Sequence, residues 1–485
     1  MFVHRPASSV RLLELLDRHQ AAVACGIATL VLLALHYSYG FTGFHYDSDQ
    51  YWSLATFDKL TTVRSARGYV FPALLSPLHY LTSAAGNPFL MYRAGMSVIY
   101  GVLLTTLLPA AFVEAFGGKL SLPRRLVPVI LTAVLFPGMV LYPLSDLPAL
   151  LLALAALMCA LRGLKTTASR KQSIAMLFAA GALMGAAYNT RTIYLFAAIP
   201  LGLLAVVRVR GDQAKAPLAR WLGLAAFVAG VLFISLPQLA INKHVRGVNS
   251  LAVQSDINSK GLFASQLAWG MTVQRYETTL YAEALTPQAL YFDPAGAKLF
   301  RDTMDGGDLF SLSYYLNVVA LHPLDFLALY TRHVVNGLDV RDGLVYTHKP
   351  SSRRNRTALF NFLVLALAAW VTVSLRARAL RIGGGGFRPA PGSWPISLAL
   401  LMLPVAAIVP GAIETRFFLP VHILAYCAIA FLFDAQLLRR SFAVHGRILL
   451  LSLALTTGAY FAMTLSTMAN HRYDWPEIYR VGPPK

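Results

Sequence analysis

Long apolar segments, separated by short polar ones, recur along almost the whole chain. A helix needs about 20 apolar residues to cross ~30 Å of hydrocarbon. Lipid offers no hydrogen-bond partner to a free backbone group, so apolar segments of this length must be helical. We predict eleven membrane-spanning helices, at residues 20–38, 89–113, 126–142, 147–161, 174–188, 192–207, 221–241, 357–375, 395–412, 417–434 and 447–466. The pattern therefore indicates an all-α polytopic membrane protein.

Two further apolar segments are interrupted by prolines or charged residues. Residues 70–85 contain Pro72 and Pro77, and residues 312–338 contain Pro323. We predict that both form amphipathic helices lying on the outer leaflet rather than spans. The alternative that both cross the membrane stays open, because the two changes in orientation would cancel.

Composition and charge support the membrane prediction and orient the chain. Of the 485 residues, 56% are hydrophobic and 13% are charged, against about a quarter charged in a soluble domain. The net charge of +20 comes from basic clusters between the apolar segments, which is the positive-inside pattern rather than a nucleic-acid-binding surface. With the N-terminus inside and its first apolar run kept as an uncleaved anchor, these clusters fall on the cytoplasmic side.

The outer face then carries two long loops, 39–88 and 242–356. The second loop is polar, rich in Asn, Gln, Asp and Tyr, and resembles a small extramembrane domain. We therefore divide the chain into an N-terminal membrane module, an outer loop region and a C-terminal membrane module, at 1–241, 242–356 and 357–485.

The first outer loop begins with an acidic sequence, Tyr46-Asp47-Ser48-Asp49, directly after the first span. A pair of carboxylates at the membrane surface could take a proton from an acceptor hydroxyl or hold a cation. The alternative is structural, with Asp49 capping a helix that begins at Gln50.

A second acid, Asp146, lies in the short turn between the third and fourth spans. The shortness of this turn holds Asp146 at the outer surface, on the same side as Asp47. Ser-Asp before a proline is also an ordinary helix start, so a capping role is the alternative here.

Two outer turns carry arginines, which are disfavoured in short outer loops. Arg191 follows the fifth span, and Arg416 follows Glu414 in the turn between the ninth and tenth spans. An anionic partner, either a carboxylate or a phosphate, would explain Arg191, and a side chain that snorkels to the surface is the alternative. For Glu414 and Arg416 the alternative is a local salt bridge.

Two more groups of arginines could bind a phosphate, one just before residues 70–85 and one at the end of the large outer loop. They are Arg64 and Arg67 in the first group, and Arg353, Arg354 and Arg356 in the second. Contact with anionic lipid headgroups explains both groups equally well.

The candidate residues share one leaflet and one order along the chain. A D-x-D follows the first span, an Asp the third and an Arg the fifth, and a large outer loop precedes a late Glu-x-Arg turn. In this order, and in the segments YDSDQYW and YPLSD, the chain resembles the GT-C superfamily of membrane glycosyltransferases. That superfamily includes the protein mannosyltransferases, the lipid A aminoarabinose transferase and the serotype-converting O-antigen glucosyltransferases. The resemblance covers the first seven spans closely and the C-terminal third more loosely.

The resemblance implies a GT-C type helical bundle and roles for several residues. Asp47 would be the catalytic carboxylate, with Asp49 as its D-x-D partner and Asp146 at the second acidic position. Interfacial helices would lie within 54–86, and phosphate-binding residues would be found among Arg64, Arg67 and the later arginines. Residues Tyr46, Glu414 and Arg416 would support the site, and a divalent cation could bind at Asp47 and Asp49.

The activity implied is that of an inverting glycosyltransferase. It would move a sugar from a polyprenyl-phosphate donor to a hydroxyl of a cell-envelope glycan, lipid or protein at the outer face of the membrane. Arg outnumbers Lys by 32 to 10, which favours a GC-rich bacterial genome and hence an inner-membrane protein whose site faces the periplasm.

A polytopic transporter or flippase of lipid-linked sugars is the main alternative, and a scaffold of the envelope is a third. Transporters place ionisable groups near the bilayer midplane. In this chain the acids lie at the outer ends of the predicted spans, and the span interiors are nearly uncharged. This distribution favours the enzyme.

Overall fold

The computed structural model describes residues 19–40, 43–60, 67–85, 87–164, 169–207, 217–254, 256–257, 260–280, 288–303, 311–341, 343–347, 353–381 and 393–472. Within this part of the chain, eight helices are long and apolar enough to cross a membrane, or nine if one bent pair counts as a single span. They are Gln20–Tyr39, Phe89–Phe116, Asp146–Gly163, Arg170–Thr190, Trp221–Arg246, Arg354–Ser374, Thr415–Leu432 and Gly446–Ala469. The prediction of an all-α polytopic membrane protein is confirmed.

Three of the eleven expected spans are shorter helices than the sequence suggested. They are α8 (Leu122–Leu135), α12 (Leu195–Val207) and α19 (Ser393–Ile408). In α8 the helix ends because Phe136 leaves the helical conformation just before Pro137. A helix of 14 residues rises only about 21 Å, which is less than the hydrocarbon thickness.

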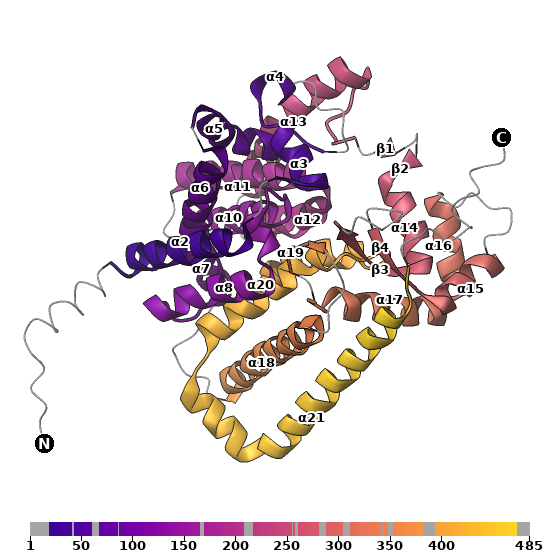
Figure 1. Ribbon diagram of the computed structural model, residues 1–485. Helices are drawn as coiled ribbons and strands as arrows, with labels where there is room; N and C mark the ends of the chain where they lie inside the picture. The colour runs from indigo at the N-terminus through magenta and orange to yellow at the C-terminus, as the bar shows by residue number, and fades with distance from the viewer. Residues whose placement is uncertain are drawn as a thin grey trace, which may run out of the picture.

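The N-terminal helices form the main core, which is drawn in indigo to magenta in Figure 1. Its centre is α10 (Asp146–Gly163), which packs against α11 (Arg170–Thr190) and α7 (Leu108–Phe116). Alanines and leucines fill most positions of α10, and most of them are buried. Neighbouring helices rather than lipid therefore surround it. Around this centre lie α2 (Gln20–Tyr39), α5 (Val70–Ala84), α6 (Pro88–Val102), η1 (Leu103–Leu107), α9 (Gly138–Leu141) and α13 (Pro217–Arg246).

Part of the C-terminal third packs on this core, and the rest extends away from it. Helices α19 and α20 (Leu419–Cys427) pack on the N-terminal helices. Helices α18 (Arg353–Arg381) and α21 (Ala435–Ala469) lie side by side, in orange and yellow in Figure 1. A π-helical turn, η5 (Ala428–Leu432), precedes α21.

The large outer loop contains a small sheet that composition alone did not indicate. Four strands lie in the order β5 (Tyr346–Thr347), β3 (Val273–Thr279), β4 (Gln288–Phe292) and β6 (His471–Arg472). Strand β6 follows α21, so the sheet joins the outer loop to the C-terminal membrane helix. The shorter elements of the loop are β1 (Asp256–Ile257), β2 (Lys260–Gly261), α14 (Leu262–Thr272) and α15 (Pro294–Thr303).

The two segments expected to form surface helices differ in their outcome. Residues 70–85 form α5, a helix of 15 residues, close to its expected bounds. Residues 312–338 form two helices, α16 (Leu312–Leu321) and α17 (Pro323–Gly337), bent by 108° from one another. The expectation of a single helix was wrong because Pro323 lacks an N–H and therefore starts a new helix better than it continues one.

Candidate active site

The acidic sequence of the first outer loop forms a short helix, α3 (Tyr46–Ser53). The side chain of Ser48 fixes its start, because Ser48 Oγ accepts from the His45 N–H at 3.0 Å and donates to the His45 carbonyl at 2.7 Å. The alternative in which Asp49 caps a helix beginning at Gln50 is therefore wrong. The Ser48 side chain caps the N-terminus of α3, and Asp47 and Asp49 both lie in its first turn.

Two guanidinium groups hold the carboxylate of Asp47. Arg67 Nη2 lies 2.6 Å from Asp47 Oδ1, and Arg416 Nη2 lies 2.8 Å from Asp47 Oδ2. Burial alone would raise the pKa of Asp47, but Arg416 and Arg67 together hold that pKa well below its usual range. Asp47 is therefore ionised at any physiological pH.

Arg416 also connects Asp47 to the two other acids that the sequence singled out. Its Nε lies 2.8 Å from Glu414 Oε2 and its Nη1 lies 3.9 Å from Asp146 Oδ2. Asp146 is paired in turn with Arg191, at 2.7 Å. These six residues form one continuous group, called the charged cluster below: Asp47, Asp146, Glu414, Arg67, Arg191 and Arg416.

The charge of this cluster depends on Glu414. Burial raises the pKa of Glu414 to about 7, the negative charges of Asp47 and Asp146 act in the same direction, and Arg416 opposes them. With Glu414 protonated, three guanidinium groups face two carboxylates. The charged cluster then carries a net positive charge and can accept an anion.

Most of the cluster lines a cavity of about 470 Å³, within the range typical of small-molecule sites. One wall is polar and includes Asp47, Arg67, Arg191 and Arg416. An adjoining apolar wall comes from α14, from the end of α19 and from the turn before α20, with Leu262, Phe263, Leu267, Ala407, Ile408 and Phe417. Phe417 also carries the guanidinium of Arg191 on its ring face, 4.9 Å from the centroid.

Hydrogen bonds between elements hold the cluster in place. Tyr51 of α3 donates to Ser145 Oγ at 3.0 Å, which ties the helix of Asp47 to the start of α10. The guanidinium of Arg67 lies over the Tyr51 ring, 4.5 Å from its centroid.

Arg67 and Arg191 are brought together by a close approach of two backbones. The Val70 N–H donates to Asn189 Oδ1 at 2.8 Å, and a Cβ on Gly68 would lie 2.1 Å from the Asn189 carbonyl oxygen. Only glycine fits there, so the segment carrying Arg67 lies directly on the end of α11.

Tyr46, expected to support the site, links α3 to the sheet. Its hydroxyl donates to the carbonyl of Thr279 in β3 at 3.1 Å. Its φ of 45° lies in the left-handed region, which is uncommon for a residue with a side chain. From the same side, Tyr346 of β5 accepts the Ser48 N–H at 3.1 Å. The outer sheet therefore helps to set the orientation of Asp47.

Other candidates lie apart from the cavity. Asp49 is exposed, and residues two apart on a helix do not share a face, so it projects away from Asp47. Arg354 contacts Glu277 of β3 at 2.5 Å, and Arg356 is exposed. Arg64 and the side chain of Arg353 lie outside the described residues.

The fit of a divalent cation at the acidic sequence can be judged from these positions. Both oxygens of Asp47 already face guanidinium groups, and Asp49 lies on another face of α3. In the described part of the chain, no group of three or more His, Cys, Asp or Glu side chains is placed to hold a metal ion. The residues around Asp47 do not fit a shared cation.

The sequence analysis missed several polar residues of the cavity, among them Gln266 and Tyr276. Tyr276, in the middle of β3, lines it beside Arg416. Nothing in the local sequence marks this tyrosine, because its position depends on a sheet whose strands come from distant segments.

No family profile matches the chain, and no curated protein sequence matches it. Among solved structures, the chain is similar to the archaeal oligosaccharyltransferase AglB from Archaeoglobus fulgidus, whose structure holds an inhibitory peptide and a dolichol-phosphate. The similarity covers 93% of this chain and 56% of that one, at 13% sequence identity and a TM-score of 0.44. The chain thus spans little more than half the length of that protein.

Proposed function

We propose that the chain is an inverting glycosyltransferase of the GT-C type. It moves a sugar from a polyprenyl-phosphate donor to a hydroxyl of a cell-envelope glycan, lipid or protein. The observation that carries the proposal is the placement of one ionised carboxylate, Asp47, among guanidinium groups on the polar wall of a cavity whose other wall is apolar.

The chemistry needs a base and a site for a departing phosphate. The acceptor oxygen attacks the anomeric carbon and loses its proton to Asp47. The bond from that carbon to the phosphate oxygen breaks, and both electrons leave with the phosphate. A positioned base contributes on the order of 10²–10⁴-fold. Because one displacement occurs from the face opposite the leaving group, the anomeric configuration inverts.

The two arginines that pair with Asp47 have a second role in this scheme. While they contact it, Asp47 is a weak base, because its pKa is low. A donor phosphate entering the cavity competes for Arg67 and Arg416. As those contacts shift to the phosphate, the pKa of Asp47 rises toward its ordinary value, so donor binding prepares the base.

The apolar wall suits the lipid part of such a donor. Ala407 and Ile408 at the end of α19 line the same cavity as the charged cluster. A polyprenyl chain could therefore pass from lipid along α19 while its phosphate reaches the arginines. This arrangement favours a lipid-linked donor over a soluble nucleotide sugar.

The charged cluster lies at one end of the membrane helices, as an enzyme at the bilayer surface requires. Asp146 begins α10, and Arg162 lies in the last turn of the same helix. The two ends are about 25 Å apart at 1.5 Å per residue. The basic end fits the cytoplasm by the positive-inside rule, which would place the cluster outside, toward the periplasm in a bacterial inner membrane.

The experiment is sugar transfer by the purified full chain in lipid nanodiscs. A panel of radiolabelled polyprenyl-phosphate sugars is supplied with envelope glycan and lipid fractions as acceptors. Asp47→Asn should bind the donor yet transfer at least a hundredfold more slowly. The matched control is Asp325→Asn, a change at an exposed acid on α17, which should transfer at the wild-type rate. Wild-type transfer by Asp47→Asn would refute the assignment of the base.

A further inference from the structure

The charged cluster has a neighbour from the outer sheet, the side chain of Tyr276. It is 9% exposed and lines the cavity. Its hydroxyl lies within electrostatic range of Glu414, Arg416, Asp47 and Arg191. Its ring meets Phe417 edge-on, with centroids 6.2 Å apart, and the guanidinium groups of Arg191 and Arg416 lie over that same ring. Tyr276 therefore shares a wall of the cavity with two arginines.

The two residues that flank Tyr276 point to the other face of β3, as alternation along a strand requires. There Arg275 and Glu277 pair at 2.6 Å. Arg354 of α18 contacts Glu277 at 2.5 Å, and Tyr291 of β4 donates to Glu277 at 3.0 Å. Burial would raise the pKa of Glu277, but Arg275 and Arg354 lower it to about 2, so these contacts are ionic.

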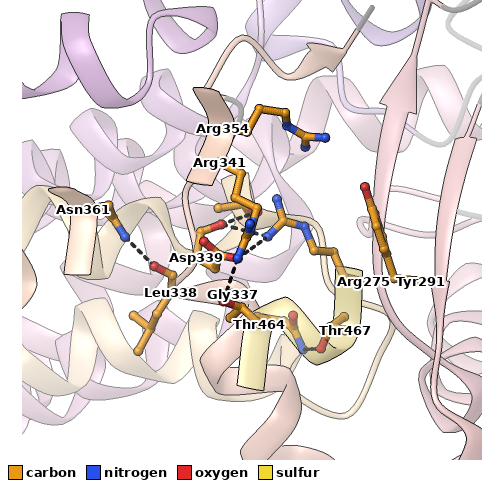
Figure 2. Close-up of polar contacts among 12 residues, drawn as sticks. Arg275, Tyr291, Gly337, Leu338, Asp339, Arg341, Arg354, Asn361, Thr464 and Thr467 are labelled. Carbon is orange, nitrogen blue, oxygen red and sulfur yellow. Dashed lines mark hydrogen bonds and ion pairs between the residues drawn. The ribbon is translucent and has the colours of Figure 1, made fainter. Parts of the chain in front are cut away.

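A second acid extends this set of contacts toward α21. Arg275 donates to the carbonyl of Asp339 at 2.8 Å, and Arg341 lies 2.5 Å from the Asp339 carboxylate. Figure 2 shows Arg275 and Arg341 converging on Asp339 from two sides. Arg341 also donates to Thr464 of α21 at 2.8 Å. We call this set the anchoring network: Arg275, Glu277, Asp339, Arg341 and Arg354.

The same strand holds the backbone that carries Glu414 and Arg416. The Tyr276 N–H donates to the Ile413 carbonyl at 2.9 Å. Thr415 Oγ1 donates to the Asp339 carbonyl at 3.4 Å. These hydrogen bonds hold the backbones of Tyr276 and Arg416 next to each other. The second bond also joins the segment of Arg416 to Asp339 of the anchoring network.

From this arrangement we propose that Tyr276 is a substrate-binding residue, whose phenol donates a hydrogen bond to the phosphate bound by Arg416. The anchoring network keeps the phenol in place. The proposal rests on the proposed function and adds to the same site a side chain that donates a hydrogen bond to the phosphate. A phenol suits this role because it gives a hydrogen bond without adding a charge.

The phenol remains a donor under all working conditions. Burial raises the pKa of Tyr276 well above its usual value. The acids Glu414 and Asp47 act in the same direction, while Arg416 and Arg191 oppose them. The hydroxyl therefore keeps its proton at neutral and mildly alkaline pH.

The test uses Tyr276→Phe in the full chain and measures binding of farnesyl phosphate and of farnesol by calorimetry in detergent. Because a hydrogen bond to a charged group is being removed, farnesyl phosphate should bind about tenfold to a hundredfold more weakly. Farnesol binding should not change. The matched control is Tyr330→Phe, which removes a phenol that contacts Tyr315 at 2.8 Å, away from the cavity.

The outcomes separate the two proposals. If the wild type binds farnesyl phosphate no better than farnesol, the proposed function itself fails. If the wild type prefers the phosphate and Tyr276→Phe binds it equally well, the role of Tyr276 is overturned while the proposed function stands.

The positioning role of the network has its own readout. Arg354→Gln should weaken farnesyl phosphate binding and Arg354→Lys should restore most of it, with both proteins melting cooperatively. Equal phosphate affinity in Arg354→Gln and the wild type would show that the network does not position Tyr276. Should Arg354→Gln fail to melt cooperatively, Arg341→Lys replaces it in the test, because lysine keeps the charge near Asp339 but loses part of the contacts of Arg341. Farnesyl phosphate should then bind more weakly to Arg341→Lys than to the wild type, and equal affinity would count against the positioning role.

Discussion

The guanidinium of Arg416 lies 2.8 Å from the carboxylate of Asp47, although 369 positions separate the two residues in the chain. Arg416 also contacts Glu414 at 2.8 Å and approaches Asp146 at 3.9 Å. One side chain thus connects three acids that lie at the starts of different helices. We regard it as the centre of the site.

Replacement of Arg416 by Gln should therefore have a large effect. The departing phosphate would lose a charged hydrogen-bond donor, so we expect transfer to fall by about 10²–10³-fold. The rate of sugar transfer in nanodiscs measures this effect. Arg301→Gln, which changes an exposed arginine of α15, is the control and should retain the full rate. A comparable loss in both variants would point to a general effect of removing positive charge.

The pair between Asp146 and Arg191 should contribute to stability as well as to binding. Asp146 is buried, with a side chain 3% exposed, and Arg191 lies 2.7 Å away. Removing one partner of a buried ion pair costs about 3–5 kcal/mol, because the other charge stays buried and unpaired. We expect Arg191→Gln, which leaves the buried Asp146 carboxylate without this partner, to lower the free energy of unfolding by an amount in this range.

A double-mutant cycle separates this pair from its surroundings. Asp146→Asn combined with Arg191→Gln should lower stability by less than the sum of the two single changes. Thermal unfolding in detergent gives the three values. Strict additivity would mean that the two side chains act independently.

Much of the site could be anticipated from the sequence because its residues lie at the ends of predicted spans. Asp47 begins a predicted outer loop and Asp146 and Arg191 each fall in a short predicted outer turn, so the predicted topology alone assigns them to one leaflet. Their pairing could not be anticipated. Which turns meet depends on how the helices are ordered around α10, and no local pattern encodes that order.

The wrong prediction for Arg354 and the missed sheet also result from contacts between segments that are distant in the chain. The position of Arg354 just before a predicted span favours phosphate binding, yet Arg354 pairs with Glu277 of β3. The four-stranded sheet was missed because β5 and β6 have two residues each and come from distant segments. Tyr276 therefore carried no signal that composition or spacing could reveal.

Gly68 offers a test of the scaffold that holds Arg67. A methyl group there would lie 2.1 Å from the Asn189 carbonyl oxygen, so Gly68→Ala must displace the segment that carries Arg67. We expect a loss of about 1–3 kcal/mol in stability and a matching loss of farnesyl phosphate affinity. Gly43→Ala is the control, since no atom lies within 4 Å of an added methyl group. Wild-type affinity in Gly68→Ala would show that Arg67 is not held through this contact.

Removal of divalent cations tests the geometry around Asp47. Because both of its oxygens face guanidinium groups and Asp49 lies on another face of α3, we expect transfer to persist in EDTA. The assay compares EDTA-treated protein with protein supplied with Mg²⁺ or Mn²⁺. A rate that vanishes with EDTA and returns with either ion would assign the acidic sequence to metal binding after all.

The proton on Glu414 should make phosphate binding depend on pH. Burial raises the pKa of Glu414 to about 7, Asp47 and Asp146 act in the same direction, and Arg416 opposes them. Below this pH the acid is neutral and the charged cluster has a net positive charge. As the pH rises through about 7, Glu414 becomes an anion that competes for Arg416, so phosphate affinity should fall.

The same shift has a consequence for stability, and its sign follows from linkage. The folded pKa lies above the usual value of 4.5, so the folded state binds the proton more tightly than the unfolded chain does. The contribution to stability is complete below about pH 4.5 and is lost as the pH rises through about 7. Glu414→Gln, which stays neutral, should remove this slope between pH 5 and 8.

Calorimetry with farnesyl phosphate between pH 5 and 8 measures the effect on binding. The phosphate itself titrates in this range, so the informative quantity is the ratio of the wild-type affinity to that of Glu414→Gln at each pH. We expect this ratio to be constant below pH 6 and to fall above pH 7, because only the wild type gains a negative charge beside Arg416 and Tyr276. A ratio that stays constant to pH 8 would mean that Glu414 does not titrate in the bound state and that the charge of the cluster is set by its other members.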